Sequence, residues 1–454
     1  MNGNIRIQVP EKAAHIIDTL TKAGYEAFAV GGCVRDSILG REPQDWDITT
    51  SARPEQVKEL FHRTIDTGLQ HGTVTVMQDK EGFEITTYRI DGEYEDSRHP
   101  KEVIFTSRLE EDLKRRDFTI NAMAYNEEQG LIDLFGGMED IRAGVIRCVG
   151  DPVERFEEDA LRMLRAIRFS AQLGYYIEQD TGDAIRKLAG TLSRISAERI
   201  QAELIKILIS DHPDYLRQAY EMGITRVFLP EFDRAMETVQ NHPHHEYTVG
   251  EHILHSLTAV RADRVLRIAM LLHDIAKPET LTVDDKGITH FHGHEGKSAE
   301  MARSILRRLK FDNDTIDRVE CLVKYHDYGN DVDPDLRILR RAVNKIGEKA
   351  FPDLFEVKAA DIAAQSDYRK CEKEERLQKW QELYAEMLEK NQCVSLKNLA
   401  VTGSDLIAAG MKPVRELGEV LQRLLDLVLD EPARNNKEQL LTEAKNIEQS
   451  MSTL

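Results

Sequence analysis

The sequence predicts an α+β protein: a head with a mixed β-sheet and flanking helices, followed by a helical neck, body and tail. Three observations predict this class. Apolar, β-rich segments separated by turns occur near the N-terminus, at residues 27–30, 73–77 and 83–88. From Asp151 onward, apolar residues recur at helical spacing instead. The chain has 454 residues, which is too long for one ordinary core and predicts about two to four domains.

Composition narrows the class of protein. Apolar residues make up 41% of the chain, enough for packed cores, and no apolar run approaches the roughly 20 residues of a membrane span. The N-terminus lacks the apolar core of a signal peptide, and the 5 cysteines show no paired spacing. We therefore expect a cytoplasmic protein with no membrane contact and no obligate protein partner. The net charge of −19 argues against non-specific coating of nucleic acid but permits a local basic cleft.

Residues 27–50 predict a strand, a glycine turn, a helix and a second strand. Asp45 and Asp47 are predicted on the second strand, where alternation would place both carboxylates on one face, close enough to share divalent metal ions. Gly31 and Gly32 allow the backbone to approach a phosphate, beside a helix start whose unpaired N–H groups attract anions. Metal carboxylates beside a phosphate cradle indicate phosphoryl or nucleotidyl transfer.

The rest of the head supports this site. Helical patterns occupy residues 11–23 and 54–61, and residues 73–88 predict a β-hairpin. Glu84 lies on the second strand of that hairpin and is the candidate for a third catalytic carboxylate; the alternative is an ordinary outward-facing strand residue. Residues 91–112 are charged and lack periodicity, which predicts a loop of the length usually kept for mobility or function.

An Arg-Asp pair follows the loop. Arg116 next to Asp117, ahead of a predicted helix, would contact a phosphate with the cation and a ribose hydroxyl with the carboxylate. Asn121 is a second candidate for the ribose contact. The alternative interpretation is a surface ion pair.

The neck begins with a helix predicted from Asp151 to residue 175. Its apolar face consists of Ala160, Met163, Leu164, Ile167 and Ala171. Arg162 and Arg165 fall on the opposite face, and Asp159 and Arg168 flank it. One interpretation is an i,i+3 salt bridge between Asp159 and Arg162. The other is base selection: an acceptor beside a donor matches the pairing edges of cytosine and adenine, whereas uracil and guanine present the reverse order.

These motifs together resemble a known family. The segments are GGCVRD (31–36), DWD (45–47), SRHP (97–100), RRDFTINA (115–122), EDALRMLRAIRF (158–169), and Glu198-Arg199 with Glu203. In this order they are similar to the bacterial-type CCA-adding tRNA nucleotidyltransferases, class II of the polymerase β superfamily. The resemblance covers roughly residues 15–210 of the chain. Related poly(A) polymerases share the head and neck but usually carry a basic extension after the RRDFT segment, which this chain lacks.

The resemblance implies a polymerase β-like head that builds the 3′ CCA end of tRNA from CTP and ATP without a nucleic-acid template. It implies Mg²⁺ at Asp45 and Asp47. The implied nucleotide-binding residues are Gly31, Gly32, Arg35, Asp36, Arg116, Asp117, Asn121, Asp159, Arg162, Arg165 and Arg168. An enzyme that adds only the final A beside a separate CC-adding partner fits the same motifs.

The body carries most of the 15 histidines. A lone helical histidine is more often structural than a ligand, but the arrangement His252, His273-Asp274 and Asp361 resembles the HD phosphohydrolase superfamily. There these four side chains hold a divalent metal, and His294 and His326 match the extra histidines of members that hold two. Nitrogen and oxygen ligands of this kind suit Mn, Fe, Ni or Mg. A third hypothesis is therefore that hydrolysis in the body is the main activity and the head only recruits RNA.

These patterns predict four domains. They are the nucleotidyltransferase head (1–150), the neck that selects nucleotides (151–235), the HD metal-binding domain (236–370) and a helical tail (371–454). An amphipathic helix within residues 398–430 predicts that the tail grips tRNA, although packing alone is nearly as good an explanation.

Overall fold

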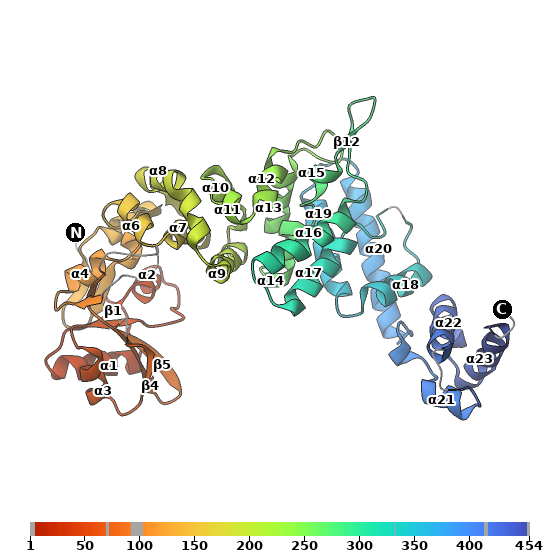
Figure 1. The fold of residues 1–454 in the computed structure, drawn as a ribbon, viewed down its shortest axis with the longest axis horizontal. Helices are drawn as coiled ribbons and strands as arrows, with labels where there is room; N and C mark the ends of the chain where they lie inside the picture. The colour runs from red at the N-terminus through yellow and green to blue at the C-terminus, as the bar shows by residue number, and fades with distance from the viewer. Residues whose placement is uncertain (1–4, 70–71, 92–102, 331, 413–415, 452–454) are drawn as a thin grey trace. The chain divides into compact units, whose positions relative to one another are not determined.

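The computed structural model describes residues 5–69, 72–91, 103–330, 332–412 and 416–451 (Figure 1). The chain divides into two compact units, Met1–Pro230 and Glu231–Leu454. The SRHP motif lies outside the described residues. None of the described helices is both long and apolar enough to cross a bilayer.

The first unit is organised by one seven-stranded mixed sheet with the order β3-β4-β5-β2-β1-β8-β9. β2 and β5 run parallel, and every other neighbouring pair is antiparallel. The strands are β1 (Ala27–Val30), β2 (Ile48–Thr50), β3 (Thr64–Gly68), β4 (Thr73–Gln78), β5 (Glu81–Thr87), β8 (Met123–Asn126) and β9 (Gly130–Asp133). The mixed sheet predicted for the head is confirmed.

The head helices follow the predicted patterns. α1 (Glu11–Lys22) contacts β1 and β2 with its buried apolar face, and α3 (Pro54–Leu60) contacts β4 (Figure 1). All four residues of β1 are buried, as expected for a central strand covered on both faces. α2 (Gly32–Ile38) starts directly after β1, and the predicted hairpin is present as β4 and β5.

Two predictions about the head are wrong in detail. Asp45 and Asp47 do not lie on a strand: they occupy an extended segment that ends immediately before β2. Part of the predicted loop 91–112 is regular structure: β7 (Val103–Phe105) pairs with β6 (Arg89–Asp91), and α4 (Leu109–Lys114) begins at residue 109. Residues 92–102 lie outside the described part of the chain. Neither element shows as periodicity in the sequence. β7 is formed by backbone pairing with β6, and α4 begins with three acidic residues in its first turn, which stabilise a helix start.

The predicted neck helix is two helices. α6 (Pro152–Glu158) ends at Asp159, whose extended backbone breaks the helix, and α7 (Leu161–Leu173) begins two residues later. The apolar face predicted for α7 is fully buried. The other described elements of this unit are α5 (Gly137–Ala143), β10 (Val145–Ile146), β11 (Tyr176–Ile177), α8 (Gln179–Leu188), α9 (Ala197–Leu208), α10 (Leu216–Glu221) and α11 (Thr225–Phe228).

The second unit is almost entirely helical. Its main helices are α12 (Pro230–Glu237), α13 (Val249–Ala259), α14 (Arg264–Leu272), α15 (Lys277–Thr280), α16 (His294–Arg308), α17 (Asn313–Tyr325), α18 (Leu336–Ile346), α19 (Phe351–Ala363), α20 (Lys370–Glu389), α21 (Gly403–Ala408), α22 (Glu416–Asp430) and α23 (Lys437–Met451). α13, α14, α17 and α19 pack against one another, and α20 packs on α18 and α19. The short pair β12 (Thr282–Val283) and β13 (Thr289–His290) precedes α16.

Candidate active sites

The head carboxylates gather where β1, β2 and β5 meet. The Asp47 carbonyl accepts a hydrogen bond from the Val30 N–H at 3.0 Å, which holds the Asp-Trp-Asp segment beside the end of β1. Because Ile48 pairs with Ile85 in parallel register, one step back along both strands places Asp47 next to Glu84. The structure therefore brings the proposed third carboxylate to the pair.

The groups around Asp47 carry more negative than positive charge. Desolvation raises the pKa of Asp47, the negative charges of Glu84 and Asp45 raise it further, and the Arg116 guanidinium opposes them. The three acids have exposed side chains. Carboxylate oxygens of this kind are the ligands that Mg²⁺ prefers, so the donor set fits the ion.

Arg116 packs against the glycine turn. Gly31 has φ 82°, which favours glycine, and a Cβ at this position would lie 3.2 Å from Nη1 of Arg116. The Gly31 N–H is already used, because it donates to the Met123 carbonyl at 3.2 Å. The turn thus brings Arg116 close to the backbone at the start of α2, beside the carboxylates.

A polar network runs from α2 to the neck. Arg35 donates to Oδ1 of Asn121 at 2.6 Å, and Nδ2 of Asn121 donates to Oδ1 of Asp117 at 3.4 Å. Oδ2 of Asp117 accepts from Nε of Arg165 at 2.8 Å. Asp36 pairs with Arg35 on the same helix. Four residues from three separate motifs, Arg35, Asp117, Asn121 and Arg165, are therefore connected by hydrogen bonds.

The arginines shift the pKa of Asp117. Its burial raises the pKa of this carboxyl, but the charges of Arg165 and Arg162 outweigh burial and lower it to about 2. Asp117 is thus ionised at neutral pH, so both of its oxygens can accept hydrogen bonds and neither carries a proton.

Phe169 is a residue that the sequence analysis missed. Its buried ring has three guanidinium carbons over it, at 3.8 Å for Arg168, 5.1 Å for Arg35 and 5.5 Å for Arg165. The face of an aromatic ring attracts cations, so Phe169 stabilises the positions of these three guanidinium groups. The available signal was its position next to Arg168 at the end of the motif.

Of the two interpretations of Asp159 and Arg162, the salt bridge between them is not the arrangement in this structure, because each pairs with another residue. Asp159 accepts from Arg199 at 2.6 Å and from the Leu161 N–H at 3.0 Å, because it lies between two helices rather than within one. Arg162 instead donates to Glu158 at 2.5 Å. The charged face of α7 is also less open than expected, since Arg168 is buried and its Nε lies 2.6 Å from Oε2 of Glu203.

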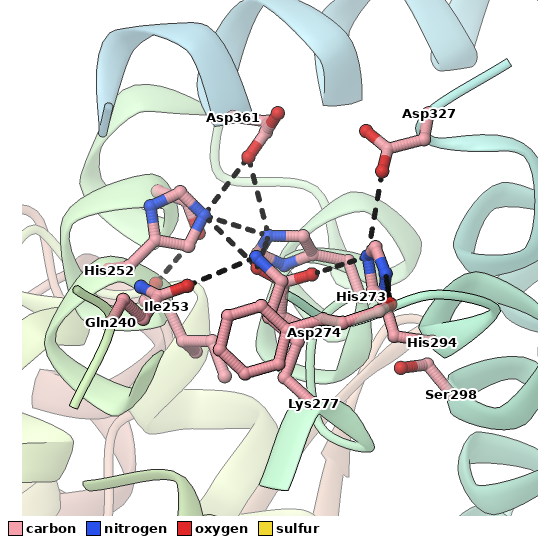
Figure 2. A network of polar contacts seen from close by, with 12 residues as sticks. Gln240, His252, Ile253, His273, Asp274, Lys277, His294, Ser298, Asp327 and Asp361 are labelled. Carbon is pink, nitrogen blue, oxygen red and sulfur yellow. Dashed lines mark hydrogen bonds and ion pairs between the residues drawn. The ribbon is translucent and has the colours of Figure 1, made fainter. Parts of the chain in front are cut away.

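The body holds a second, more compact group of potential ligands (Figure 2). His252, His273, Asp274 and Asp361 each offer an atom within 4.8 Å of the others, and Asp274, His294 and His326 form an adjoining group. All six are buried. The helices place them: His252 lies on α13, His273 and Asp274 follow α14, His294 starts α16, His326 follows α17, and Asp361 lies on α19.

The ring orientations at this site fit metal ions. Nδ1 of His273 and His326 each lie 2.7 Å from a backbone carbonyl three residues earlier, and Nδ1 of His294 lies 2.8 Å from another. Since a carbonyl only accepts, these Nδ1 atoms carry the proton and the Nε2 lone pairs face inward. Nε2 of His252 and His273 are 3.1 Å apart, and those of His294 and His326 are 3.3 Å apart. Two unprotonated Nε2 atoms this close cannot hydrogen-bond to each other, so each pair needs a cation, either a proton or a metal ion, between or beside it.

The charges point the same way. Burial lowers the pKa of His273, but Asp274 and Asp361 outweigh it and raise the pKa to about 10, which shows a strong local preference for positive charge. Both oxygens of buried Asp274 lack a hydrogen bond of regular geometry; Nζ of Lys277 forms an ion pair with one at 2.5 Å.

Asp327 is a further ligand candidate that the sequence analysis missed. Its Oδ2 lies 3.5 Å from Nε2 of His294 and 3.7 Å from Nε2 of His326 (Figure 2). The sequence carried a signal, since His326-Asp327 is a second His-Asp dipeptide.

Comparisons with known proteins match both units. The poly(A) polymerase head domain family matches residues 27–147, the probable RNA- and SrmB-binding site of polymerase A matches 174–236, and the putative domain 2 of tRNA nucleotidyltransferase matches 280–444. A CCA-adding enzyme of Lactobacillus helveticus is 36% identical over 432 residues, covering 94% of this chain and 94% of that protein. The chain belongs to the CCA-adding enzymes.

Other CCA-adding enzymes are similar to this chain over nearly its whole length. That of Levilactobacillus brevis is 35% identical over 95% of this chain and 96% of its own. The crystal structure of the Bacillus stearothermophilus CCA-adding enzyme in complex with CTP is similar with a TM-score of 0.73 and 30% identity, covering 98% of this chain and 100% of that one. This CCA-adding enzyme is therefore a nucleotidyltransferase with the α+β class predicted from sequence, and enzymes of this family use divalent metal ions.

Proposed function

We propose that the head and neck transfer CMP and AMP from CTP and ATP to the 3′ end of tRNA. The observation that carries the proposal is the placement of Asp45, Asp47 and Glu84 beside Arg116 and the Asp117 network. In this reaction the terminal 3′-hydroxyl oxygen bonds to the α-phosphorus, the bond to diphosphate breaks, and the hydroxyl proton leaves to solvent. Mg²⁺ held by the carboxylates would stabilise the negative charge on the attacking and the leaving oxygen of this in-line displacement.

Each network residue has a proposed role. Arg116 meets the triphosphate, while Asp117 and Asn121 accept and orient the ribose hydroxyls. Arg165 keeps Asp117 ionised and fixed. Asp159 and Arg162 read the base edge, which requires them to exchange Arg199 and Glu158 for the nucleotide. Arg35 and Arg168, which both lie over the ring of Phe169, position the network.

The test compares two tRNA substrates. We expect labelled CTP and ATP to be incorporated into tRNA that lacks the whole CCA end. An enzyme that only adds A would leave that substrate unchanged and extend tRNA already ending in CC. That second result would replace full CCA addition with A addition.

We also propose that the body is a metal-dependent phosphoesterase. The facing Nε2 pairs carry this proposal, because they provide two adjoining cation sites from the same buried ligands. Bound metal would activate water and hold the phosphate. Hydrolysis joins the water oxygen to phosphorus and breaks the ester bond, and the leaving ribose oxygen takes a proton from the water.

A metal titration tests the second activity. The full chain, stripped of metal and reloaded with Mn²⁺, Fe²⁺, Ni²⁺ or Mg²⁺, should bind about two ions in the body, as the adjoining ligand groups imply, and should then hydrolyse a 2′,3′-cyclic nucleotide. Binding without hydrolysis would reduce the site to a structural one.

We further propose the division into a head (1–150), a neck (151–235), a metal-binding body (236–370) and a tail (371–454) that contacts tRNA. The matched RNA-binding family at residues 174–236 supports RNA contact in the neck. A cytoplasmic location accords with tRNA as the substrate.

A further inference from the structure

The metal-ligand groups of the body lie in a large cavity. Its volume is about 660 Å³, within the range of small-molecule sites. Asp274, His294 and Asp361 line it from one side, and α20 lines it from another. Since a single phosphate group fills only a small part of this volume, the cavity has room for a larger ligand than inorganic phosphate.

One face of α20 presents cations to this cavity. Lys373 and Arg376, one helical turn apart, both line it, together with Trp380 a further turn along. Because these residues share a face, their side chains form a continuous wall, which we call the α20 wall and define as Lys373 and Arg376.

Neither cation of the α20 wall forms an ion pair with a described acid, although the charges of Asp361 and Asp327 act on Lys373 from further away. Nζ of Lys373 donates to Oε1 of Gln365 at 2.5 Å, and Arg376 donates to the carbonyl of Asn330. Among the described residues, no carboxylate oxygen lies within 4.0 Å of either cation, and the nearby Glu372 pairs with Arg369. Burial lowers the pKa of the half-buried Lys373. An ammonium has three donors and a guanidinium five, so most donors of the wall are available to an anion.

The wall is joined to the metal ligands by a short hydrogen-bond chain. Gln365 accepts from Lys373 with its oxygen and donates with its nitrogen to Oδ2 of Asp361 at 2.7 Å. Two hydrogen bonds and one amide group therefore separate Lys373 from a metal ligand, a span of at most about 8 Å. The phosphate groups on the two sides of one ribose are separated by a comparable span.

We infer that the body hydrolyses phosphate esters of nucleotides whose ribose carries a second phosphate group, with the scissile phosphate at the metal ligands and the second phosphate on the α20 wall. The inference rests on the proposed phosphoesterase activity. Water adds to the scissile phosphorus, the bond to the ribose oxygen breaks, that oxygen takes a proton, and the second phosphate stays bound to the wall and unchanged. A nucleoside 3′,5′-bisphosphate and the phosphorylated 3′ end of an RNA both have this chemistry.

The test compares two substrates with the same scissile bond. The Mn²⁺-loaded full chain is given adenosine 3′,5′-bisphosphate or adenosine 3′-monophosphate, and kcat/KM is measured for release of the 3′-phosphate. We expect the bisphosphate to be preferred by about tenfold or more, as for one charge-assisted anion contact. Lys373→Gln and Arg376→Gln should each reduce the ratio of the two rates towards one, and Lys373→Arg should restore it.

A matched control and a binding measurement separate the outcomes. Lys379→Gln changes an exposed lysine of α20 that does not line the cavity, so the ratio should stay at the wild-type value. Equal rates for the two nucleotides in the wild type would overturn the inference while leaving the phosphoesterase intact. If neither nucleotide is hydrolysed, the proposed phosphoesterase activity fails. Calorimetric binding of the same two nucleotides then tests the anion site by itself. Bisphosphate binding that is tighter by about tenfold and depends on Lys373 supports the anion site, and equal binding of the two nucleotides rejects it.

Discussion

The head carboxylates and the body ligands differ in how far they are assembled before any ligand arrives. In the body, buried ligand atoms lie within 4.8 Å of one another in two groups. The head acids Asp45, Asp47 and Glu84 are exposed, and among the described residues they form no such group. The body ligands are therefore already close together in the free chain, whereas the carboxylates of the head acids lie further apart.

Local structure explains the contrast. Four body ligands sit at helix ends or follow them, and the rings of His273, His294 and His326 are each locked by a hydrogen bond to a carbonyl of the same helix end. Asp45 and Asp47 sit on an extended segment before a three-residue strand. Burial and hydrogen bonds to their second ring nitrogens hold the body histidines in one orientation, whereas exposed carboxylates outside a helix or strand lack that support.

The largest expected effect tests the head acids. Asp47→Asn keeps the side-chain size but removes the charge that would hold Mg²⁺, a loss of several kcal/mol in the transition state, or about a thousandfold or more in CMP and AMP incorporation. Single-turnover incorporation into tRNA measures it. Phosphoester hydrolysis in the body should be unchanged.

Glu81→Gln is the matched control for this variant. It removes an exposed acid from β5, the strand that carries Glu84, but its present partner is Lys12. Near-normal incorporation by Asp47→Asn would refute the metal assignment and leave the head without a catalytic centre.

The next effect tests the body ligands. His273→Asn removes an imidazole from the buried group, so bound metal should fall and hydrolysis should decrease by more than about a hundredfold, since changes merely adjacent to ligands cost ten- to a hundredfold. Metal analysis and hydrolysis of a 2′,3′-cyclic nucleotide measure both. His255→Asn, on the same unit but stacked on Tyr247 outside the groups, should retain both. A loss of CCA addition in folded His273→Asn would show that the two sites are coupled.

A smaller effect is expected for base selection. Asp159→Ala leaves the amino group of cytosine or adenine unpaired in the pocket, which costs on the order of 1 to 3 kcal/mol, or about ten- to a hundredfold for both CTP and ATP. Discrimination against UTP and GTP should shrink by a similar factor. The measurement is single-turnover incorporation of all four triphosphates.

Arg199→Gln distinguishes base selection from a structural role. It removes the partner that Asp159 has in this structure without touching the acid. If Asp159 serves only that ion pair, both variants lower stability alike and keep the order of nucleotide preference. Unchanged selectivity in Asp159→Ala would move base choice to Arg165, Arg168 or the RNA end.

The sequence predicted the residues of both sites better than their contacts. Helical periodicity located α1, α3 and α7, and β-alternation located β4 and β5, because each has one buried face. Helical periodicity could not predict the helix break at Asp159. It also could not predict that Asp159 pairs with Arg199 of α9 and Arg162 with Glu158, because these partners depend on how the helices pack. β3, β8 and β9 were also missed, because they are formed by pairing across the sequence rather than by a strong local pattern. The body ligands were found through the resemblance of His252, His273-Asp274 and Asp361 to the HD phosphohydrolase superfamily, and not from helical periodicity.

The smallest expected effect concerns the Asp117 network and measures how much it stabilises the first unit in the absence of a nucleotide. The pKa of Asp117 is about 2 in the folded chain and 3.8 ordinarily, so folding favours the ionised form. This contribution is fully present above about pH 4 and is lost as the pH falls towards 2. At pH 7, Asp117→Asn should therefore destabilise the first unit by at most about 2 kcal/mol. The difference should narrow at pH 3. Urea unfolding followed by Trp46 fluorescence in a Trp380→Phe background isolates this unit, because each unit has one of the 2 tryptophans. A difference that is constant from pH 7 to 3 would assign the effect to lost hydrogen bonds rather than to charge. A difference near zero would mean that the contact between Arg165 and Asp117 does not stabilise the free chain.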